Sequence, residues 1–414
     1  MNCGDLQVKI CGFTCKNPFF LAASPVARTG EMISRAFDAG WGGAVTKSVS
    51  LDQDLPDRSL SPRFAGIQPG GSNTQLQSRV PGLGNIDFRI DASVKDTFYS
   101  FEKMKVNYPN HMLIISIKGN YIKEEWQKLA LLSVNAGANA IECCLSCPDS
   151  DGGAIGQNPT SVRQVIEWIK QVTNLPVIIK LTGHVASISQ IAKAARDSGA
   201  EAVSAVNTFK GIGGLNLRTK FPLPTIQNKS TSVGISGGLI KSLAQYQVYE
   251  IARELPGYPI SGVGGITCGL DALEYLLLGA TTVQVATQVM YEGYDVVQTF
   301  IDSIENYLKI NEIMSINSII GSQIENMVPG TSYLKRDQQL RAYVDDNLCI
   351  RCGRCYTSCN DGAYQAIEIN NDRSIKINKE KCVGCGLCRL VCPVPGAIFY
   401  TQFDNPLVKI DDLN

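Results

Sequence analysis

Short apolar runs alternate with segments of helical periodicity from residue 19 to about residue 287. Eight runs have the composition of buried strands: Phe19–Ala23, Gly43–Lys47, Met112–Ile117, Ala138–Cys143, Pro176–Leu181, Glu201–Val206, Pro259–Gly262 and Thr281–Ala286. Helical periodicity marks the segments Glu31–Ala39, Glu124–Ala136, Ser161–Gln171, Ser187–Ser198, Ser242–Leu255 and Leu270–Leu278. Strands alternating with helices predict a parallel sheet, and eight such units favour a (β/α)8 TIM barrel over an open doubly wound sheet.

Two longer segments interrupt this alternation, residues 49–110 after the second run and residues 207–239 after the sixth. Both are rich in glycine, proline and polar residues. Each leaves the carboxyl end of a strand, which is the face where barrel enzymes build their active sites. After residue 308 the strand pattern stops, and we expect a helix and a linker there.

The last part of the chain carries two cysteine runs with the spacing C-x2-C-x2-C-x3-C. Two such runs are typical of a small α+β ferredoxin domain with two [4Fe–4S] clusters, in which the fourth cysteine of each run ligates the other cluster. The expected ligands are Cys349, Cys352, Cys355 and Cys392 for one cluster, and Cys382, Cys385, Cys388 and Cys359 for the other. A zinc site would leave several of these cysteines unexplained, and disulfides are typical of secreted chains.

We therefore expect the barrel domain over residues 1–314, a linker over 315–340 and the ferredoxin domain over 341–414. The 38 basic and 38 acidic residues give no net charge that would favour nucleic acid or an anionic membrane as a partner. We expect no membrane span and no signal peptide. The many cysteines then favour a reducing cytoplasm.

The barrel sequence has no G-x-G-x-x-G after its first strand and no P-loop, so a Rossmann site for NAD(P) is not expected. Its clearest glycine signal, GVGG at Gly262–Gly265, follows the seventh strand, where barrels bind phosphate through backbone N–H groups. The signal is either a tight turn or the phosphate site of a flavin, since iron–sulfur clusters need a two-electron partner. Lys47 and Lys180 end two strands and either form salt bridges at the rim or stabilise a reduced flavin.

A cysteine-rich segment, Cys143–Pro148, follows the fourth strand and leads into a loop with glycines. Cys147 is placed as an acid/base thiol, because a thiol with a reference pKa of about 8.5 exchanges its proton near neutral pH. A buried structural thiol is the alternative. Asn85, Asn207 and Thr208 carry amide and hydroxyl groups suited to a polar ring substrate.

Together these motifs resemble the iron–sulfur/flavin subunit of bacterial NAD-dependent dihydropyrimidine dehydrogenases, whose barrel is similar to class 1A dihydroorotate dehydrogenases. The resemblance covers nearly the whole chain. It rests on AGWGGAVTKS at Ala39–Ser48, SPRF at Ser61–Phe64, LSCP at Leu145–Pro148, GQNP at Gly156–Pro159, KLT at Lys180–Thr182, NT at Asn207–Thr208, SGG at Ser236–Gly238, GVGGI at Gly262–Ile266 and the ferredoxin tail.

The resemblance implies FMN in the barrel, held by Ala23, Ser24, Lys47, Ser48, Lys180, Ser236, Gly237, Gly238, Gly264, Gly265, Ala286 and Thr287. It implies reduction, or formation, of the C5=C6 bond of a pyrimidine such as uracil or thymine, with Cys147 as the general acid that protonates C5. The implied substrate contacts are Asn85, Ser146, Asn207 and Thr208. Electrons would come from NAD(P)H through the clusters, supplied by a separate NAD(P)H-oxidising flavoprotein subunit or a soluble ferredoxin in a homo- or hetero-oligomer.

Two positions depart from the family pattern. Cys144 stands where the family usually has an asparagine, and Gly183 and His184 stand where proline and asparagine follow the fifth strand. Loss of a polar partner weakens discrimination between ring substrates, so another cyclic amide, heterocycle or enone is an alternative substrate. We count Cys144 and His184 as candidate substrate contacts, although His184 could equally be a rim residue. An electron-transfer subunit without its own substrate is the remaining alternative.

Overall fold

The computed structural model of the protein describes residues 4–54, 63–67, 81–86, 92–145, 155–334 and 340–400. The chain divides into two compact units, Met1–Asn326 and Met327–Asn414. Each unit has a hydrophobic core of its own. In the part of the chain that is described, no helix is both long enough and apolar enough to cross a membrane.

The first unit is built on a closed barrel of eight strands in the order β10-β15-β16-β3-β4-β7-β8-β9. All neighbouring strands in it are parallel. Each predicted strand run forms one of them, which confirms the predicted barrel: β3 Phe19–Leu21, β4 Gly43–Val45, β7 Met112–Ile117, β8 Ala140–Cys144, β9 Val177–Leu181, β10 Ala202–Ala205, β15 Ile260–Val263 and β16 Thr282–Val285. The strands are mostly apolar because helices cover their outer side.

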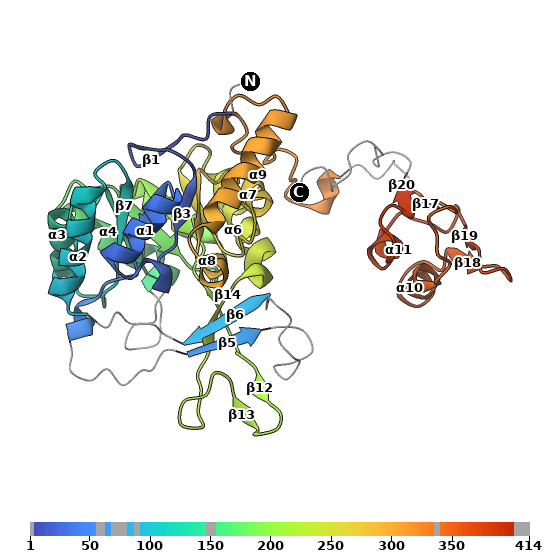
Figure 1. The fold of residues 1–414 in the computed structure, drawn as a ribbon, viewed down its shortest axis with the longest axis horizontal. Helices are drawn as coiled ribbons and strands as arrows, with labels where there is room; N and C mark the ends of the chain where they lie inside the picture. Colours follow the sequence, from blue (N-terminus) through green and yellow to red (C-terminus); the bar gives the residue numbers. More distant parts are fainter. Residues whose placement is uncertain are drawn as a thin grey trace. The chain divides into compact units, whose positions relative to one another are not determined.

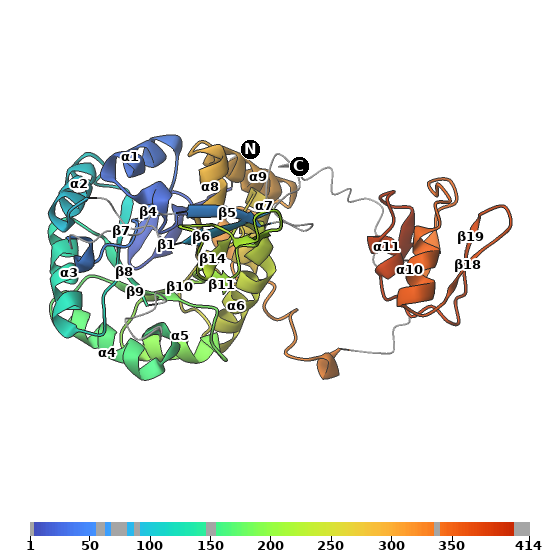
Figure 2. The ribbon, with the colours of Figure 1, turned by 90° about the horizontal axis from the view of Figure 1, so that it is seen from below.

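Helices surround the barrel, as Figure 2 shows. They are α1 Gly30–Ala39, α2 Val94–Asn107, α3 Lys123–Asn135, α4 Pro159–Lys170, α5 Ile188–Asp197, α6 Lys241–Glu254, α7 Gly269–Leu277, α8 Thr287–Glu292 and α9 Val296–Ile310. Side-chain caps start several of them; the Thr29 hydroxyl accepts the Met32 N–H, and the Asn158 side chain accepts the Thr160 N–H. Helix α2 lies in a segment for which the sequence analysis named no helix, yet Ser93 caps it in the same way.

Strands from the two long insertions form an antiparallel sheet in the order β11-β14-β6-β5, which we call the roof sheet. Its strands are β5 Arg63–Ile67, β6 Gly82–Ile86, β11 Phe209–Gly211 and β14 Val233–Ser236. Figure 1 shows β5, β6 and β14 at one end of the barrel, with the short pair β12 Leu215–Asn216 and β13 Phe221–Pro222 projecting beyond them. A separate hairpin, β1 Val8–Ile10 and β2 Phe13–Cys15, precedes the barrel.

The first unit continues past residue 314, where the sequence analysis placed the end of the barrel domain. Ile316 and Ile319 are buried in the barrel's core cluster, and the unit runs to Asn326. The prediction of a helix after residue 308 is wrong. Helix α9 ends at Ile310, and residues 311–334 contain only the short 3-10 helices Ile316–Ser318 and Thr331–Tyr333. The burial of apolar side chains therefore assigns residues 315–326 to the barrel.

The second unit contains two antiparallel strand pairs and two helices that begin inside the cysteine runs. Strand β17 Ala342–Val344 pairs with β20 Ile398–Tyr400, and β18 Ile367–Ile369 pairs with β19 Ile375–Ile377. Helices α10 Arg354–Gly362 and α11 Leu387–Leu390 each start after a glycine in the left-handed region, Gly353 with φ +78° and Gly386 with φ +88°. Glycine tolerates this conformation, which lets the chain turn tightly between consecutive cysteines.

Candidate active site

A cavity of about 600 Å³ opens at the carboxyl ends of the barrel strands, beneath the roof sheet. This volume lies in the range of small-molecule and cofactor sites. Sixteen of the predicted site residues line it: Ala23, Ser24, Lys47, Ser48, Asn85, Cys144, Lys180, Asn207, Thr208, Ser236, Gly237, Gly238, Gly264, Gly265, Ala286 and Thr287. Ser146 and Cys147 lie outside the described residues. The twelve residues named for cofactor binding thus share one cavity with Asn85, Cys144, Asn207 and Thr208 from the substrate set.

Glycines form one wall of the cavity and bring backbone close to its interior. Gly264 and Gly265 follow β15 with φ of +127° and +72°, a region that favours glycine. A Cβ on Gly265 would lie 2.5 Å from the backbone nitrogen of Lys241, at the start of α6. Gly237 precedes the 3-10 helix that leads into α6. Backbone N–H groups at a helix start, next to glycine turns, are typical of a phosphate site.

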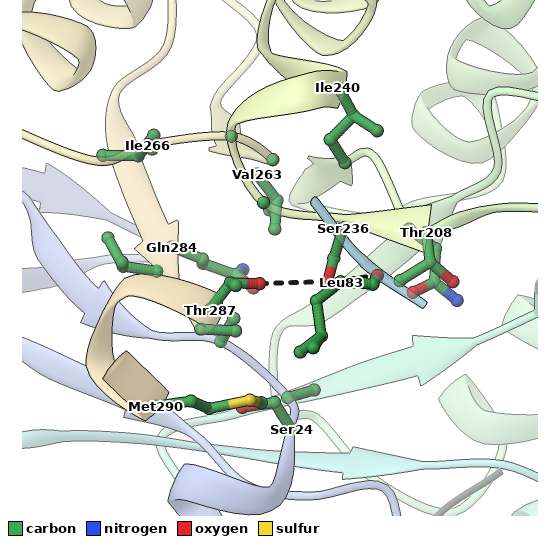
Figure 3. A pocket seen from close by; sticks show the side chains of 18 of the residues that line it. Ser24, Leu83, Thr208, Ser236, Ile240, Val263, Ile266, Gln284, Thr287 and Met290 are labelled. Carbon is green, nitrogen blue, oxygen red and sulfur yellow. Dashed lines mark hydrogen bonds between the residues drawn. The ribbon is translucent and has the colours of Figure 1, made fainter. Parts of the chain in front are cut away.

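Polar side chains continue this wall, as Figure 3 shows. The Thr287 and Ser236 hydroxyl oxygens lie 3.0 Å apart, so that a hydrogen bond joins α8 to β14. Across the cavity, the hydroxyl of Ser24 is buried and has no hydrogen-bond partner among the described residues. A buried hydroxyl without a partner is costly. Ser24 is therefore suited to bond a ligand in the cavity.

The floor of the cavity is a buried polar network that the sequence analysis did not identify. Lys180 donates to the side-chain oxygen of Gln284 at 3.1 Å. Gln284 in turn donates to a carboxylate oxygen of Glu142 at 3.2 Å. The sequence does contain a signal for this network. Glu142 and Gln284 are polar residues at buried positions of otherwise apolar strands, and a buried polar group needs a partner.

The roof sheet places Asn85 and Thr208 together. The Asn85 side-chain nitrogen donates to the carbonyl of Gly234 at 2.8 Å. A Cβ on Gly234 would lie 2.6 Å from the Thr208 hydroxyl oxygen and 3.2 Å from the Asn85 side-chain nitrogen. The glycine therefore lets both polar side chains approach the same point of β14. Because Asn85 and Thr208 come from different insertions, only the paired strands bring them together.

His184 does not line the cavity, unlike Cys144. Its ring nitrogen Nε2 accepts the backbone N–H of Lys210 at 2.6 Å. Its ring also makes an edge contact with Phe209 in β11, at a centroid distance of 5.4 Å. Gly183 allows this approach, because a Cβ there would lie 2.5 Å from the Phe209 ring. His184 thus ties the segment after β9 to the edge strand of the roof sheet.

Asp271 in α7 supports the glycine wall from behind. It accepts the backbone N–H and the hydroxyl of Thr267 at 2.8 and 2.6 Å, and the Lys241 ammonium at 2.6 Å. Burial by itself would raise the pKa of Asp271, but the hydrogen bonds from Lys241 and Thr267 outweigh it and hold the pKa below its ordinary value. The carboxylate joins the start of α6 to the loop after Gly265.

The cysteines of the second unit surround two small cavities. One is lined by Cys349, Cys352, Cys355 and Cys392, and the other by Cys359, Cys382, Cys385 and Cys388. Each group combines the first three cysteines of one run with the fourth of the other, which is the arrangement expected from two-cluster ferredoxins. Among the described residues, no group of three or more His, Cys, Asp or Glu side chains is arranged to hold a single metal ion.

Each of the two units matches the model of a known protein family. The family model for dihydroorotate dehydrogenase matches residues 5–308, and that for a 4Fe-4S dicluster domain matches residues 342–399. The chain is 35% identical over 397 residues to the NAD-dependent dihydropyrimidine dehydrogenase subunit PreA of Escherichia coli (strain K12), a match that covers 94% of each chain.

Two further relatives match at similar identity. The chain is 31% identical over 345 residues to the chloroplastic dihydropyrimidine dehydrogenase (NADP(+)) of Arabidopsis thaliana, covering 81% of this chain and 80% of that one. It is 36% identical over 320 residues to the catalytic subunit of dihydroorotate dehydrogenase B (NAD(+)) of Pyrococcus abyssi, covering 76% of this chain and 98% of that one. The Escherichia coli relative, whose match covers 94% of this chain and so extends over the second unit, is named for dihydropyrimidine.

Proposed function

The chain belongs to the dihydroorotate dehydrogenase family and carries a 4Fe-4S dicluster domain after the barrel, and we propose that it is an FMN- and iron–sulfur-dependent oxidoreductase acting on pyrimidines. It reduces, or in reverse forms, the C5=C6 bond of a pyrimidine such as uracil or thymine. One observation carries the proposal. A single chain combines a cavity lined by glycine turns, lysines and side-chain amides with two smaller cavities that are each lined by four cysteines.

The cavity fits FMN. The glycine wall at Gly237, Gly264 and Gly265 would hold the phosphate, because a side chain at Gly265 has no room there. The Ser24 hydroxyl, which has no partner within the part of the chain that is described, supplies a further hydrogen bond. Lys180 places an ammonium group at the cavity floor, where it stabilises negative charge on a bound ring. Bound there, FMN supplies two-electron chemistry, the exchange of a hydride with the substrate.

Asn85, Asn207 and Thr208 would hold the substrate ring, because amides and a hydroxyl can pair with its carbonyl and N–H groups. Cys147 is proposed as the general acid that protonates C5. The described residues support its location in one respect: the Leu145 carbonyl accepts the Gly156 N–H at 2.8 Å. Leu145 and Gly156, which flank the segment containing Ser146 and Cys147, are therefore joined beside Cys144, which lines the cavity.

Electrons for this reaction are proposed to come from NAD(P)H through the two clusters. The matched relative of Escherichia coli is named as a subunit, and this chain has no Rossmann fingerprint after its first strand. We therefore propose a separate NAD(P)H-oxidising flavoprotein, or a soluble ferredoxin, as the electron donor. Thiolate-held clusters persist in reducing compartments, so we place the enzyme in the cytoplasm.

An anaerobic half-reaction tests the proposal. The purified chain is assayed for FMN and iron, reduced chemically, and mixed with uracil, thymine or a panel of cyclic imides and enones. We expect one FMN per chain, iron for two [4Fe–4S] clusters, and reoxidation by uracil or thymine. Reoxidation by another cyclic compound alone would replace the pyrimidine with that substrate and would identify Cys144 as the residue to examine. A chain that holds clusters but no FMN would contradict the proposal and favour an electron carrier.

A further inference from the structure

The carboxylate of Glu142 lies at the cavity floor, and the proposed reaction gives it no role. Glu142 is in the middle of β8 and its side chain is fully buried. It lines the cavity together with Lys180 and Gln284. A buried carboxylate is expensive unless it is paired and hydrogen-bonded. The groups that pair with the Glu142 carboxylate must therefore offset the cost of burying it, and they indicate its role.

The two oxygens of Glu142 have different environments. Oε2 accepts the Ser204 hydroxyl at 2.6 Å and the Gln284 side-chain nitrogen at 3.2 Å. Oε1 has no hydrogen-bond partner among the described residues, and it lies 3.7 Å from the Lys180 ammonium nitrogen. Ser204 and Gln284 thus fix the carboxylate so that its second oxygen faces Lys180. The contact is an ion pair without a hydrogen bond.

Lys180 is held from two sides. Its ammonium group donates to the oxygen of Gln284 at 3.1 Å and faces Glu142 Oε1. The lysine is buried, with 4% of its surface exposed, so water screens this pair only weakly. A lone ammonium group at this point would give the cavity floor a net positive charge. The carboxylate offsets that charge and orients the amine.

We propose that Glu142 is a positioning residue that holds Lys180 and keeps the reduction potential of the cavity's flavin more negative than Lys180 alone would set it. The inference rests on the proposed function, because it needs FMN in the cavity. A positive group beside the ring favours the reduced, more negative form, and an offsetting carboxylate weakens that effect. A more negative potential makes the reduced enzyme a stronger donor to a C=C bond.

Redox titration of the full-length holoenzyme tests this inference without any substrate. The flavin absorbance is followed against potential, while electron paramagnetic resonance follows the clusters. We expect Glu142→Gln to shift the flavin potential to a more positive value, and Lys180→Met to shift it to a more negative one. Glu167→Gln, on the exposed face of α4, is the matched control and should leave the potential unchanged.

The double variant Glu142→Gln/Lys180→Met, compared with Lys180→Met, decides the case even if Glu142→Gln fails to fold. It buries no unpaired charge, and neutral replacement of a buried pair is tolerated better than removal of one partner. Because Glu142 acts through Lys180, the potential of the double variant should lie close to that of Lys180→Met. A double variant more positive than Lys180→Met by the full Glu142→Gln shift, or a Glu142→Gln shift that is zero or negative, would overturn the inference.

The same cycle shows whether Glu142 acts through Lys180. If it does, the shift caused by Glu142→Gln depends on whether Lys180 is present, and a non-additive pair results. Equal shifts in both backgrounds would mean that the carboxylate acts on the flavin directly, against a positioning role. A wild-type chain without FMN would contradict the proposed function, and with it the inference, whereas normal FMN content without a potential shift would contradict the inference alone.

Discussion

Gly265 and Gly257 have nearly the same backbone conformation, with φ of +72° and +76°, but different surroundings. A Cβ on Gly265 would lie 2.5 Å from the backbone of Lys241, while nothing lies within 4 Å of a Cβ on Gly257. We expect Gly265→Ala to lose most bound FMN, because the backbone of α6 must shift away from the glycine wall. Gly257→Ala carries only the strain of positive φ, about 1 kcal/mol, and should keep its FMN.

FMN released by denaturation, measured by fluorescence per mole of chain, checks this prediction. Both variants should keep the far-ultraviolet circular dichroism of the wild type. Equal FMN content in the two variants would contradict the assignment of the glycine wall to the phosphate.

Most cavity residues were predictable because they occupy strand ends or glycine turns. Lys47 and Lys180 end apolar strands, and Gly264 and Gly265 follow one, so their positions follow from the barrel. Glu142 and Gln284 were missed although they are polar residues within apolar strands. Strands that are buried on both faces have no alternating pattern to show which side chains face the barrel interior. His184 could not be placed from the sequence, since its partner Lys210 is brought near only by folding of an insertion.

At the scale of elements, the contact of His184 with β11 gives a second prediction. His184→Ala removes the acceptor of the Lys210 N–H and loosens the edge strand that follows Thr208. A hydrogen bond contributes a net free energy of about 0.5–1.5 kcal/mol. If substrate binding loses that amount, the KM for substrate should rise about two- to tenfold. The FMN content should stay unchanged, because His184 does not line the cavity.

His184→Gln is the matched variant, because its amide oxygen can still accept the N–H. Steady-state kinetics should place its KM between those of the wild type and His184→Ala. If the alanine variant lowers kcat and leaves KM alone, then His184 has a different role from positioning the roof sheet.

Asp271 gives a prediction about pH. Its pKa is lowered in the folded protein: burial opposes this, but hydrogen bonds from Lys241 and Thr267 prevail. A carboxyl group whose pKa is depressed by folding stabilises the protein above its unfolded-state pKa, and that contribution disappears as pH falls through the folded-state pKa. We therefore expect Asp271→Asn to lower the Tm at neutral pH, with the difference from the wild type shrinking below about pH 4.

Thermal melts from pH 3 to pH 7 measure that difference. Asp372→Asn is the control, because Asp372 also has a lowered pKa, from its hydrogen bonds with Ser374, but is exposed on the second unit. Its substitution should change the Tm little, since exposed interactions are screened. A pH-independent effect of Asp271→Asn would mean that side-chain packing, and not charge, supports the glycine wall.

The elements themselves were predictable to different degrees. Buried parallel strands give long apolar runs, so every barrel strand was found. Helix α2 was missed although its buried residues Val94, Phe98 and Phe101 have helical spacing, because the surrounding segment is rich in glycine and proline. The roof sheet pairs short strands from two insertions far apart in the chain, and no local pattern specifies such pairing.

At the scale of the whole molecule, the end of the first unit gives the last prediction. Ile316 and Ile319 are buried in the barrel core, and the Gly321 N–H donates to the Leu276 carbonyl at 2.9 Å. A chain cut after residue 326 keeps these contacts, whereas a chain cut after residue 314 loses them. Each fully buried isoleucine contributes roughly 1.5–3 kcal/mol. We expect the 1–326 fragment to bind FMN and melt near the barrel transition of the full chain.

The 1–314 fragment should melt at a clearly lower temperature and hold less FMN. Differential scanning calorimetry with FMN quantification compares the two fragments. Because the clusters lie in the other unit, the 1–326 fragment should exchange electrons between substrate and an artificial acceptor, while it should no longer accept them from a donor that reduces the clusters. Equal stability of the two fragments would mean that residues 315–326 are a linker after all. Loss of FMN from the 1–326 fragment would mean that the barrel needs the second unit to form its site.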